Sequence, residues 1–571
     1  MSKQSEQKRA QGERPRIALI TNHGYAGVEI PVGGAPDTGG QNSYVNSLAA
    51  ALDELGYDVT IFARGGFPFF DSSRIRRGTE QLGEHSRYVY VPGGGGEFIH
   101  KEDIAPALDE ETAWLERYVE ERAAEAGLDP WSYFTCVNTH YWDAAVMGVK
   151  LVERWRDRRA FEFLRGAAGG VLASGLERFA GDEMHRLGLS REIHLHLGSL
   201  ALEASNGDDP GAALELLGVD LERGEAEDLE SPPGDVAPTH RDLLRAWRLG
   251  RVLFERLEVG GEGLADLFAG ANRHVWTPHS IGVIKERNYW NKEPEVVRSL
   301  KFRERDSHEQ MVCSRTPLFC STSPEIWRAL VSWHGVEPER IFDFPPCIDG
   351  RIFRPRDDDE LGEAYAYLAH ESGLPEEKLR KGKIVFETSR MDHTKRKDLL
   401  LEAFADVAEE IDDVYLFIGG GPDHSPVFGE LAELREKLPA LEGRGFLLGF
   451  VPEEVLEPLF SLADVFATAS EMEGFGMSAS QAAAAGTALI CSDLIPFATQ
   501  YAADAALVFP AGDREQLASA LKRLLRDDEE RNRKGRELQE IAAKLDWRAT
   551  AERFLEWFEH NRPEADPTSR R

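Results

Sequence analysis

Two basic side chains, Arg390 and Lys395, follow a short apolar run that ends at Thr388. The stretch SRMDHTK leads from this predicted strand into a predicted helix, which places both cations on one loop at a strand end. In a chain with 100 acidic and 67 basic residues, such a pair is a selective feature. A charge-assisted hydrogen bond to phosphate contributes roughly 1.5–3 kcal/mol. We predict that both cations bind one diphosphate; a solvated basic cluster is the alternative.

A second loop combines glycine with carboxylates. The sequence EMEGFG, residues 471–476, follows a predicted strand and precedes a predicted helix over 478–485. Gly474 and Gly476 allow the backbone to approach a ligand closely, and the carboxylate of Glu473 is suited to accept hydrogen bonds from sugar hydroxyls.

A third loop, GGAPDTGGQ at residues 33–41, lies near the start of the chain. Gly39 and Gly40 precede a predicted helix, whose first backbone N–H groups and dipole favour an anion. A tight turn with a purely structural role is the alternative. The helix is predicted from apolar residues at helical spacing, with a glycine as C-terminal cap: Val45, Leu48, Leu52, Leu55 and Gly56.

Two histidines end predicted strands of the N-terminal half, His140 in NTHYW and His279 in WTPHS. A single histidine at a strand end is usually structural. Because the carboxyl ends of parallel strands share one edge of a sheet, we expect both to face one site.

Short β-rich runs that alternate with helical patterns must position these residues, as in parallel sheets built from βαβ units. The first series of strands is expected at 17–21, 59–63, 88–91, 136–139, 275–277 and 318–321, and the second at 384–388, 414–418, 446–449, 465–469, 488–491 and 506–509. The α/β chain is therefore predicted to form two Rossmann-like lobes with a ligand cleft between them.

The N-terminal lobe is expected over residues 15–355 and the C-terminal lobe over 380–545, joined by a charged connection. A terminal helix over 550–560 is expected to cross back to the N-terminal lobe. A helical insertion at about 151–258 interrupts the first series. Within it, residues 201–240 contain eleven acidic residues and one arginine, which indicates a solvated segment.

The net charge of −33 argues against binding to nucleic acid or to an anionic membrane. No segment has the length and hydropathy of a signal peptide or a membrane span, so a cytoplasmic location is expected. The five cysteines form no CxxC pair and are expected to be reduced core thiols.

Taken together, these motifs resemble retaining glycosyltransferase family 4, and within it the branch of sucrose-phosphate synthase and sucrose synthase. The resemblance rests on PDTGGQNSYVNSLAAAL, GEFIHKED, NTHYWDA, TPHSIGVIK, SRMDHTKRK and FATASEMEGFGMSASQAAAAGTALICSD. It covers both lobes in the same order and leaves out the insertion.

The resemblance implies the GT-B fold, a nucleotide diphosphate sugar as co-substrate, and transfer with retention of anomeric configuration, without metal or cofactor. It implies catalytic roles for His279, Glu473, Arg390 and Lys395. The implied donor-binding residues are Gly39, Gly40, Gln41, Arg390, Lys395, Gly474, Phe475, Gly476 and Gln481, and the implied acceptor-binding residues are Lys101, His140 and Lys285.

Two positions depart from the family pattern. Gln481 stands where the family has a second glutamate, and Val283 stands where sucrose-phosphate synthase has an arginine that helps to bind the acceptor phosphate. These changes, together with the insertion, weigh against fructose 6-phosphate as the acceptor.

The expected reaction moves a hexose, with glucose preferred, from UDP or ADP to a small polar acceptor. The alternatives are a nucleotide-sugar epimerase, which would convert the donor without an acceptor, and an inactive subunit that binds a partner. The oligomeric state is not predicted.

Overall fold

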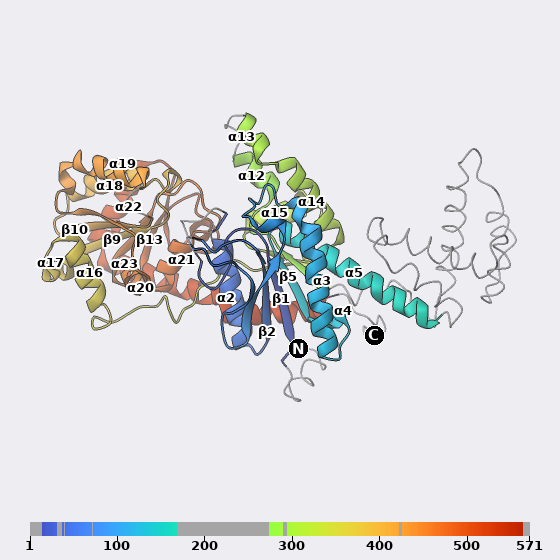
Figure 1. Ribbon diagram of the computed structural model, residues 1–571. Helices are drawn as coiled ribbons and strands as arrows, with labels where there is room; N and C mark the ends of the chain where they lie inside the picture. Colours follow the sequence, from blue (N-terminus) through green and yellow to red (C-terminus); the bar gives the residue numbers. More distant parts are fainter. Residues whose placement is uncertain are drawn as a thin grey trace, which may run out of the picture.

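The computed structural model describes residues 14–30, 37–38, 40–70, 72–167, 273–288, 294–421 and 425–562. Two α/β bodies follow one another along the chain (Figure 1). The predicted insertion lies outside the described residues from 168 onward, and so does Gly39.

The N-terminal lobe is built on an eight-stranded sheet in the order β3-β4-β2-β1-β5-β6-β7-β8, in which only the pair β3–β4 is antiparallel. Its strands are β1 (Arg16–Thr21), β2 (Asp58–Gly65), β3 (Gly78–Gln81), β4 (Ser86–Pro92), β5 (Cys136–His140), β6 (His274–Thr277), β7 (Leu318–Ser321) and β8 (Ile341–Asp343). Its helices are α2 (Gly40–Glu54), α3 (Leu108–Glu125), α4 (Pro130–Tyr133), α5 (Trp142–Ala167), α12 (Gly282–Asn288), α13 (Pro294–Ser299), α14 (Phe302–Arg315) and α15 (Pro324–Ser332).

Helices pack on both faces of this sheet. Because successive residues of a strand point to opposite sides, a strand contributes to two cores. On β1, Ala18 and Ile20 pack with α3 and α5, whereas Ile17 and Leu19 pack in the core that contains α2. Helix α24 (Trp547–Asn561) joins this second core, so the end of the described chain returns to the N-terminal lobe (Figure 1).

The C-terminal lobe is built on a parallel six-stranded sheet in the order β11-β10-β9-β12-β13-β14. Its strands are β9 (Lys383–Thr388), β10 (Val414–Gly419), β11 (Gly445–Gly449), β12 (Val465–Thr468), β13 (Ala488–Ser492) and β14 (Leu507–Phe509). Its helices are α16 (Gly362–Ser372), α17 (Glu376–Lys381), α18 (Lys397–Ala408), α19 (Pro426–Glu436), α20 (Glu453–Leu462), α21 (Met477–Ala484), α22 (Arg514–Arg526) and α23 (Asp528–Ala542).

Each strand expected from the sequence is present, and the structure adds two. Strand β3 is an edge strand whose residues are mostly exposed, and β8 has three residues. Neither has the run of apolar residues by which a buried strand is recognised. The charged connection contains α16 and α17, whose buried Leu368 and Leu379 pack into the core of the C-terminal lobe.

The five cysteines are buried and free, as expected. Among the described residues, no helix is both long enough and apolar enough to cross a membrane.

Candidate active site

The candidate residues of the N-terminal lobe gather where β1, β5 and β6 end. In the parallel register, Thr21 lies beside His140, and His140 lies beside Thr277. The residues that follow these three strands therefore emerge at one edge of the sheet, which is the usual place of a ligand site in such sheets.

The structure brings the two predicted histidines together. Nδ1 of His140 lies 3.1 Å from Nε2 of His279, and both rings contact Tyr44. Burial lowers the pKa of His140 to about 3. Burial also holds the pKa of His279 well below its usual value, and the neighbouring His140 lowers it further. Both imidazoles are therefore neutral at physiological pH.

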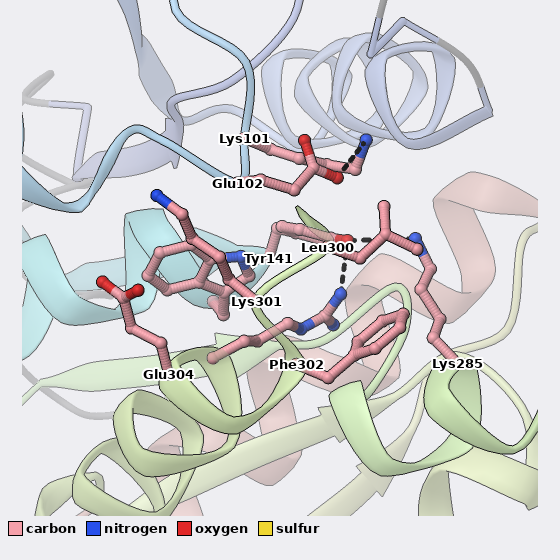
Figure 2. Close-up of a pocket in the computed structure, with 10 residues that line it drawn as sticks. Lys101, Glu102, Tyr141, Lys285, Leu300, Lys301, Phe302 and Glu304 are labelled. Carbon is pink, nitrogen blue, oxygen red and sulfur yellow. Dashed lines mark hydrogen bonds and ion pairs between the residues drawn. The ribbon is translucent and has the colours of Figure 1, made fainter. Parts of the chain in front are cut away.

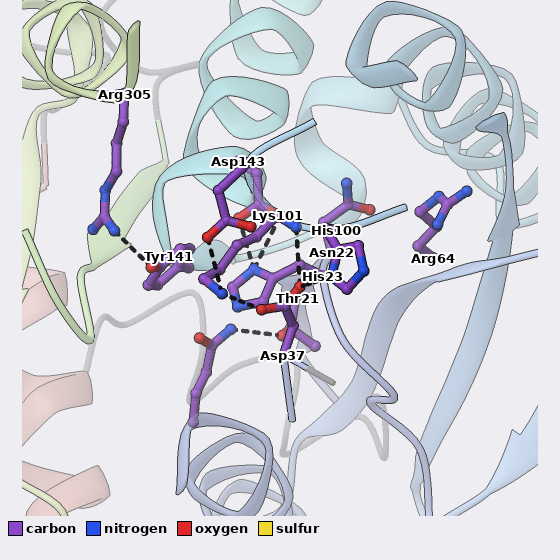
Figure 3. Close-up of polar contacts among 12 residues, drawn as sticks. Thr21, Asn22, His23, Asp37, Arg64, His100, Lys101, Tyr141, Asp143 and Arg305 are labelled. Carbon is purple, nitrogen blue, oxygen red and sulfur yellow. Dashed lines mark hydrogen bonds and ion pairs between the residues drawn. The ribbon is translucent and has the colours of Figure 1, made fainter. Parts of the chain in front are cut away.

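A third histidine, His23, lies at the end of β1 and was missed by the sequence analysis. Its Nδ1 lies 3.1 Å from the carboxylate of Asp143, and its ring packs on Tyr141 (Figure 3). Burial lowers the pKa of His23, but the Asp143 carboxylate outweighs that effect and raises it. His23 and Asp143 come shortly after the predicted strands 17–21 and 136–139, and this position was the available signal.

Tyr141 occupies the centre of this edge in an unusual backbone conformation, with φ of 78°. Its hydroxyl lies 2.6 Å from Arg305 Nη1 and 3.1 Å from Lys285 Nζ. Burial alone would raise the pKa of Tyr141, but the two cations and His23 lower it to about 7. Such a shift is typical of a functional site, and here its source is a local concentration of positive charge.

A small pocket of about 100 Å³ opens beside Tyr141 (Figure 2). Four cationic side chains line it, together with two carboxylates: Lys101, Lys285, Lys301, Arg305, Glu102 and Glu304. Arg305 also forms an ion pair with Glu309, with 2.7 Å between Nε and Oε1. No carboxylate of the described residues pairs with Lys285. Two of the three predicted acceptor residues, Lys101 and Lys285, therefore line one basic pocket.

Two side chains near the start of α2 contribute to this edge: Asp37, which precedes the helix, and Gln41, in its first turn. Asp37 forms an ion pair with Lys101, and burial, which alone would raise its pKa, is outweighed by Lys101, so the pKa falls. Gln41 Nε2 donates to Thr21 Oγ1 at 3.1 Å. Gln41 thus contacts the end of β1, and Asp37 contacts Lys101 of the basic pocket (Figure 3).

In the C-terminal lobe, the loop after β9 places Lys395 and Arg390 differently. Lys395 is 5% exposed, and its Nζ donates to Glu473 Oε1 at 2.6 Å. Arg390 is 65% exposed and lies 3.4 Å from Asp392. The structure therefore brings together Lys395 and Glu473, while Arg390 extends into solvent.

The donor candidates in and after the loop that follows β12 lie in different environments. Gly476 has φ of 100°, and a Cβ atom there would lie 2.5 Å from Ile495, so glycine is required. The Phe475 side chain is buried against Phe497 and Tyr501, which leaves only its backbone for a ligand. Gln481 is half-buried in the second turn of α21.

Two groups of metal-ligand side chains occur among the described residues, both in the N-terminal lobe. In the group of Asp37, His100 and Glu102, the Lys101 ammonium already pairs with both carboxylates. In the group of Asp306, Glu309 and His334, Glu309 already accepts from Arg305 and from the backbone N–H of Gly282. Metal independence stays a prediction.

The architecture, two lobes with parallel sheets and polar residues at the strand ends, is the GT-B fold. Residues 370–540 match the family glycosyl transferases group 1. The chain is 24% identical to mannosylfructose-phosphate synthase of Agrobacterium fabrum over 485 residues, which covers 83% of this chain and 75% of that protein.

Solved structures support the same fold. Sucrose-phosphate synthase from Thermosynechococcus elongatus superimposes with a TM-score of 0.57 at 19% identity, covering 96% of this chain and 99% of that chain. Anabaena Alr3699/HepE in complex with UDP-glucose gives a TM-score of 0.50 at 11% identity, covering 95% and 99%. The chain contains a group 1 glycosyltransferase domain within a GT-B fold, and it is a glycosyltransferase.

Proposed function

We propose that this enzyme transfers a hexose, glucose in the first instance, from UDP to a small polar acceptor that carries a phosphate group, with retention of anomeric configuration. The observation that carries the proposal is the basic pocket beside Tyr141, because four cations line it in a chain of net charge −33. A phosphate monoester carries about 1.5–2 negative charges at pH 7 and suits such a pocket.

On the donor side, Lys395 and Arg390 neutralise the diphosphate. Positive charge beside the leaving group lowers the barrier, because the diphosphate gains negative charge as the sugar–oxygen bond breaks. Glu473, which Lys395 holds at 2.6 Å, accepts hydrogen bonds from hydroxyls of the transferred sugar. In the same-face mechanism, the acceptor oxygen bonds to the sugar carbon on the face from which the diphosphate departs, and the diphosphate takes the proton of that hydroxyl. The acceptor itself is thus the nucleophile, and the protein supplies none.

His279 lies beside the sugar carbon that reacts, and His140, whose Nδ1 is 3.1 Å from His279 Nε2, helps to bind the acceptor. Their low pKa values keep both rings neutral, so they contribute hydrogen bonds without repelling the positive charge that develops on the sugar. The name of the Agrobacterium relative, mannosylfructose-phosphate synthase, agrees with a phosphorylated acceptor.

Product analysis tests the proposal. Purified enzyme is incubated with radiolabelled UDP-glucose and with matched pairs of hexoses and hexose 6-phosphates. We expect transfer to at least one phosphorylated acceptor and at least tenfold lower kcat/KM for its dephosphorylated partner. Lys285→Met should raise the KM for the phosphorylated acceptor about tenfold, about 1.4 kcal/mol, and change the KM for the donor little.

Equal turnover of both partners in every pair would contradict the phosphate assignment. Incubation with UDP-glucose alone checks the epimerase alternative, because an epimerase would convert the donor without an acceptor. Calorimetric titration with nucleotide sugars checks the inactive-subunit alternative, which predicts no binding.

A further inference from the structure

A buried ion pair lies directly beneath the loop that carries Arg390. Lys397, in the first turn of α18, places its Nζ 2.7 Å from Glu387 Oε2, at the end of β9. The two side chains are 1% and 2% exposed. Burying two charges is costly and rarely gains net stability over apolar residues of similar size. A pair in this position therefore calls for a role besides stability.

The pair binds the backbone of the loop. Lys397 Nζ also donates to the carbonyl oxygen of Ser389 at 3.0 Å and to that of Gly419 at 2.7 Å. Glu387 Oε1 accepts from the hydroxyl of Ser389 at 2.5 Å. Ser389, the residue immediately before Arg390, is thus held at both its carbonyl and its side chain.

The loop after β10 closes over the same residue. Gly420 has φ of 100°, and a Cβ atom there would lie 1.8 Å from the carbonyl oxygen of Ser389. At Gly421, a Cβ atom would lie 2.6 Å from Cβ of Met391. The backbone around Arg390 is therefore packed between this glycine loop and the buried ion pair.

The far end of the loop is fixed as well. The backbone N–H of Glu471 donates to the carbonyl oxygen of Thr394 at 2.7 Å, next to Lys395. Both ends of the 389–395 loop are thus anchored, whereas the Arg390 side chain between them is exposed. Anchoring the backbone lowers the entropy lost when this side chain closes on a ligand.

We propose that Lys397 and Glu387 are positioning residues of the donor site: they fix the backbone of Ser389, and through it the direction in which Arg390 leaves the loop toward the diphosphate. This inference rests on the proposed donor-binding function of the loop. Neither residue contacts the sugar or the phosphates in this account, so their effect falls on donor binding and leaves the acceptor pocket unchanged.

The test is the double variant Glu387→Leu/Lys397→Met, which replaces the ion pair by apolar side chains of similar size. Such a replacement usually preserves the fold. We expect a folded protein whose melting temperature is lowered, because the carbonyl oxygens of Ser389 and Gly419 lose their donor. We expect a donor KM raised about tenfold and an acceptor KM within twofold of wild type. Lys534→Met is the matched control, because Lys534 is another buried lysine that donates to backbone carbonyls, those of Asp504 and Ala505.

Glu387→Gln provides a second measurement if the double variant fails to fold. It keeps the shape of the side chain and weakens the hold on Lys397, so we expect the donor KM to rise about threefold. A donor KM within experimental error of wild type in the folded double variant, or in Glu387→Gln if the double variant does not fold, would overturn the inference. An equal rise for Lys534→Met would also overturn it, because any buried lysine would then matter.

Lys395→Ala separates this inference from the function on which it rests. If Lys395→Ala leaves the donor KM and kcat unchanged, the donor site is misplaced and both proposals fail. If Lys395→Ala is impaired while the double variant is not, only the positioning role fails.

Discussion

The two lobes prepare their candidate ligand-binding side chains in different ways. In the N-terminal lobe, Lys285 and Arg305 both contact the Tyr141 hydroxyl in the pocket, and Arg305 also pairs with Glu309. In the C-terminal lobe, Lys395 pairs with Glu473, and Arg390 is exposed. The proposed acceptor side is therefore organised without a ligand, whereas binding at the proposed donor side requires the exposed Arg390 to move.

This difference has a consequence for affinity. A preorganised site loses little side-chain entropy on binding, but its charges partly compensate one another. A site with an exposed arginine loses more side-chain entropy, but on binding it gains a charge-assisted hydrogen bond that it did not have before. Four substitutions, taken from the largest expected effect to the smallest, probe the two sides.

Lys395→Ala should have the largest effect. It removes a phosphate contact and leaves the half-buried Glu473 without its cation. We expect kcat/KM to fall about a hundredfold, about 2.7 kcal/mol, with the fold intact. Steady-state kinetics and circular dichroism provide the measurement. Unchanged turnover would show that the diphosphate binds elsewhere.

Arg390→Ala should be milder, because the side chain makes only the 3.4 Å contact with Asp392 before binding. We expect about a thirtyfold loss of kcat/KM, about 2 kcal/mol. The effects of the two substitutions should not add in the double variant, since both side chains bind one group. Additive losses would mean that they act on separate groups.

Tyr141→Phe tests the N-terminal lobe through the pH dependence of the acceptor KM. The hydroxyl is neutral below its pKa of about 7 and negatively charged above it. A phenolate competes with the acceptor phosphate for Lys285 and Arg305, so the acceptor KM of wild type should rise about tenfold from pH 6 to pH 8, about 1.4 kcal/mol. Ionisation of the acceptor itself affects both enzymes and cancels in the ratio of their KM values.

The variant should therefore lack most of this pH-dependent rise. If the KM values of wild type and Tyr141→Phe change in parallel with pH, Tyr141 does not ionise in the range that matters for acceptor binding. The donor KM serves as an internal control, because Tyr141 lies in the pocket of the other lobe.

Gln481→Glu should have the smallest effect, and a favourable one. In the family pattern a glutamate here binds the ribose hydroxyls, and a carboxylate accepts stronger hydrogen bonds than an amide. We expect donor binding to tighten by roughly 0.5–1.5 kcal/mol in calorimetric titration, with unchanged acceptor preference. Weaker binding would mean that Gln481 is adapted to a different contact of the nucleotide.

The sequence by itself determined twelve strands of the two sheets and the order of the motifs. Strands such as 384–388 and 465–469 were expected because buried parallel strands are continuous apolar runs, and α2 because its apolar residues recur at helical spacing. The exposed edge strand β3 escaped prediction because the same rule depends on burial. Gly476 was singled out because glycine allows close approach of a ligand, and the structure adds that its φ of 100° favours glycine.

Only the tertiary structure decided which charged groups meet. Lys395 and Glu473 are 78 positions apart, and Arg305 and Tyr141 are 164 positions apart. No local pattern encodes such pairs, because packing of whole elements sets the distance between them. The sequence showed Lys395 and Arg390 as equivalent cations on one loop, and the fold buried one against a carboxylate and left the other exposed. Burial and pairing, which depend on every neighbouring element, gave the two residues different environments.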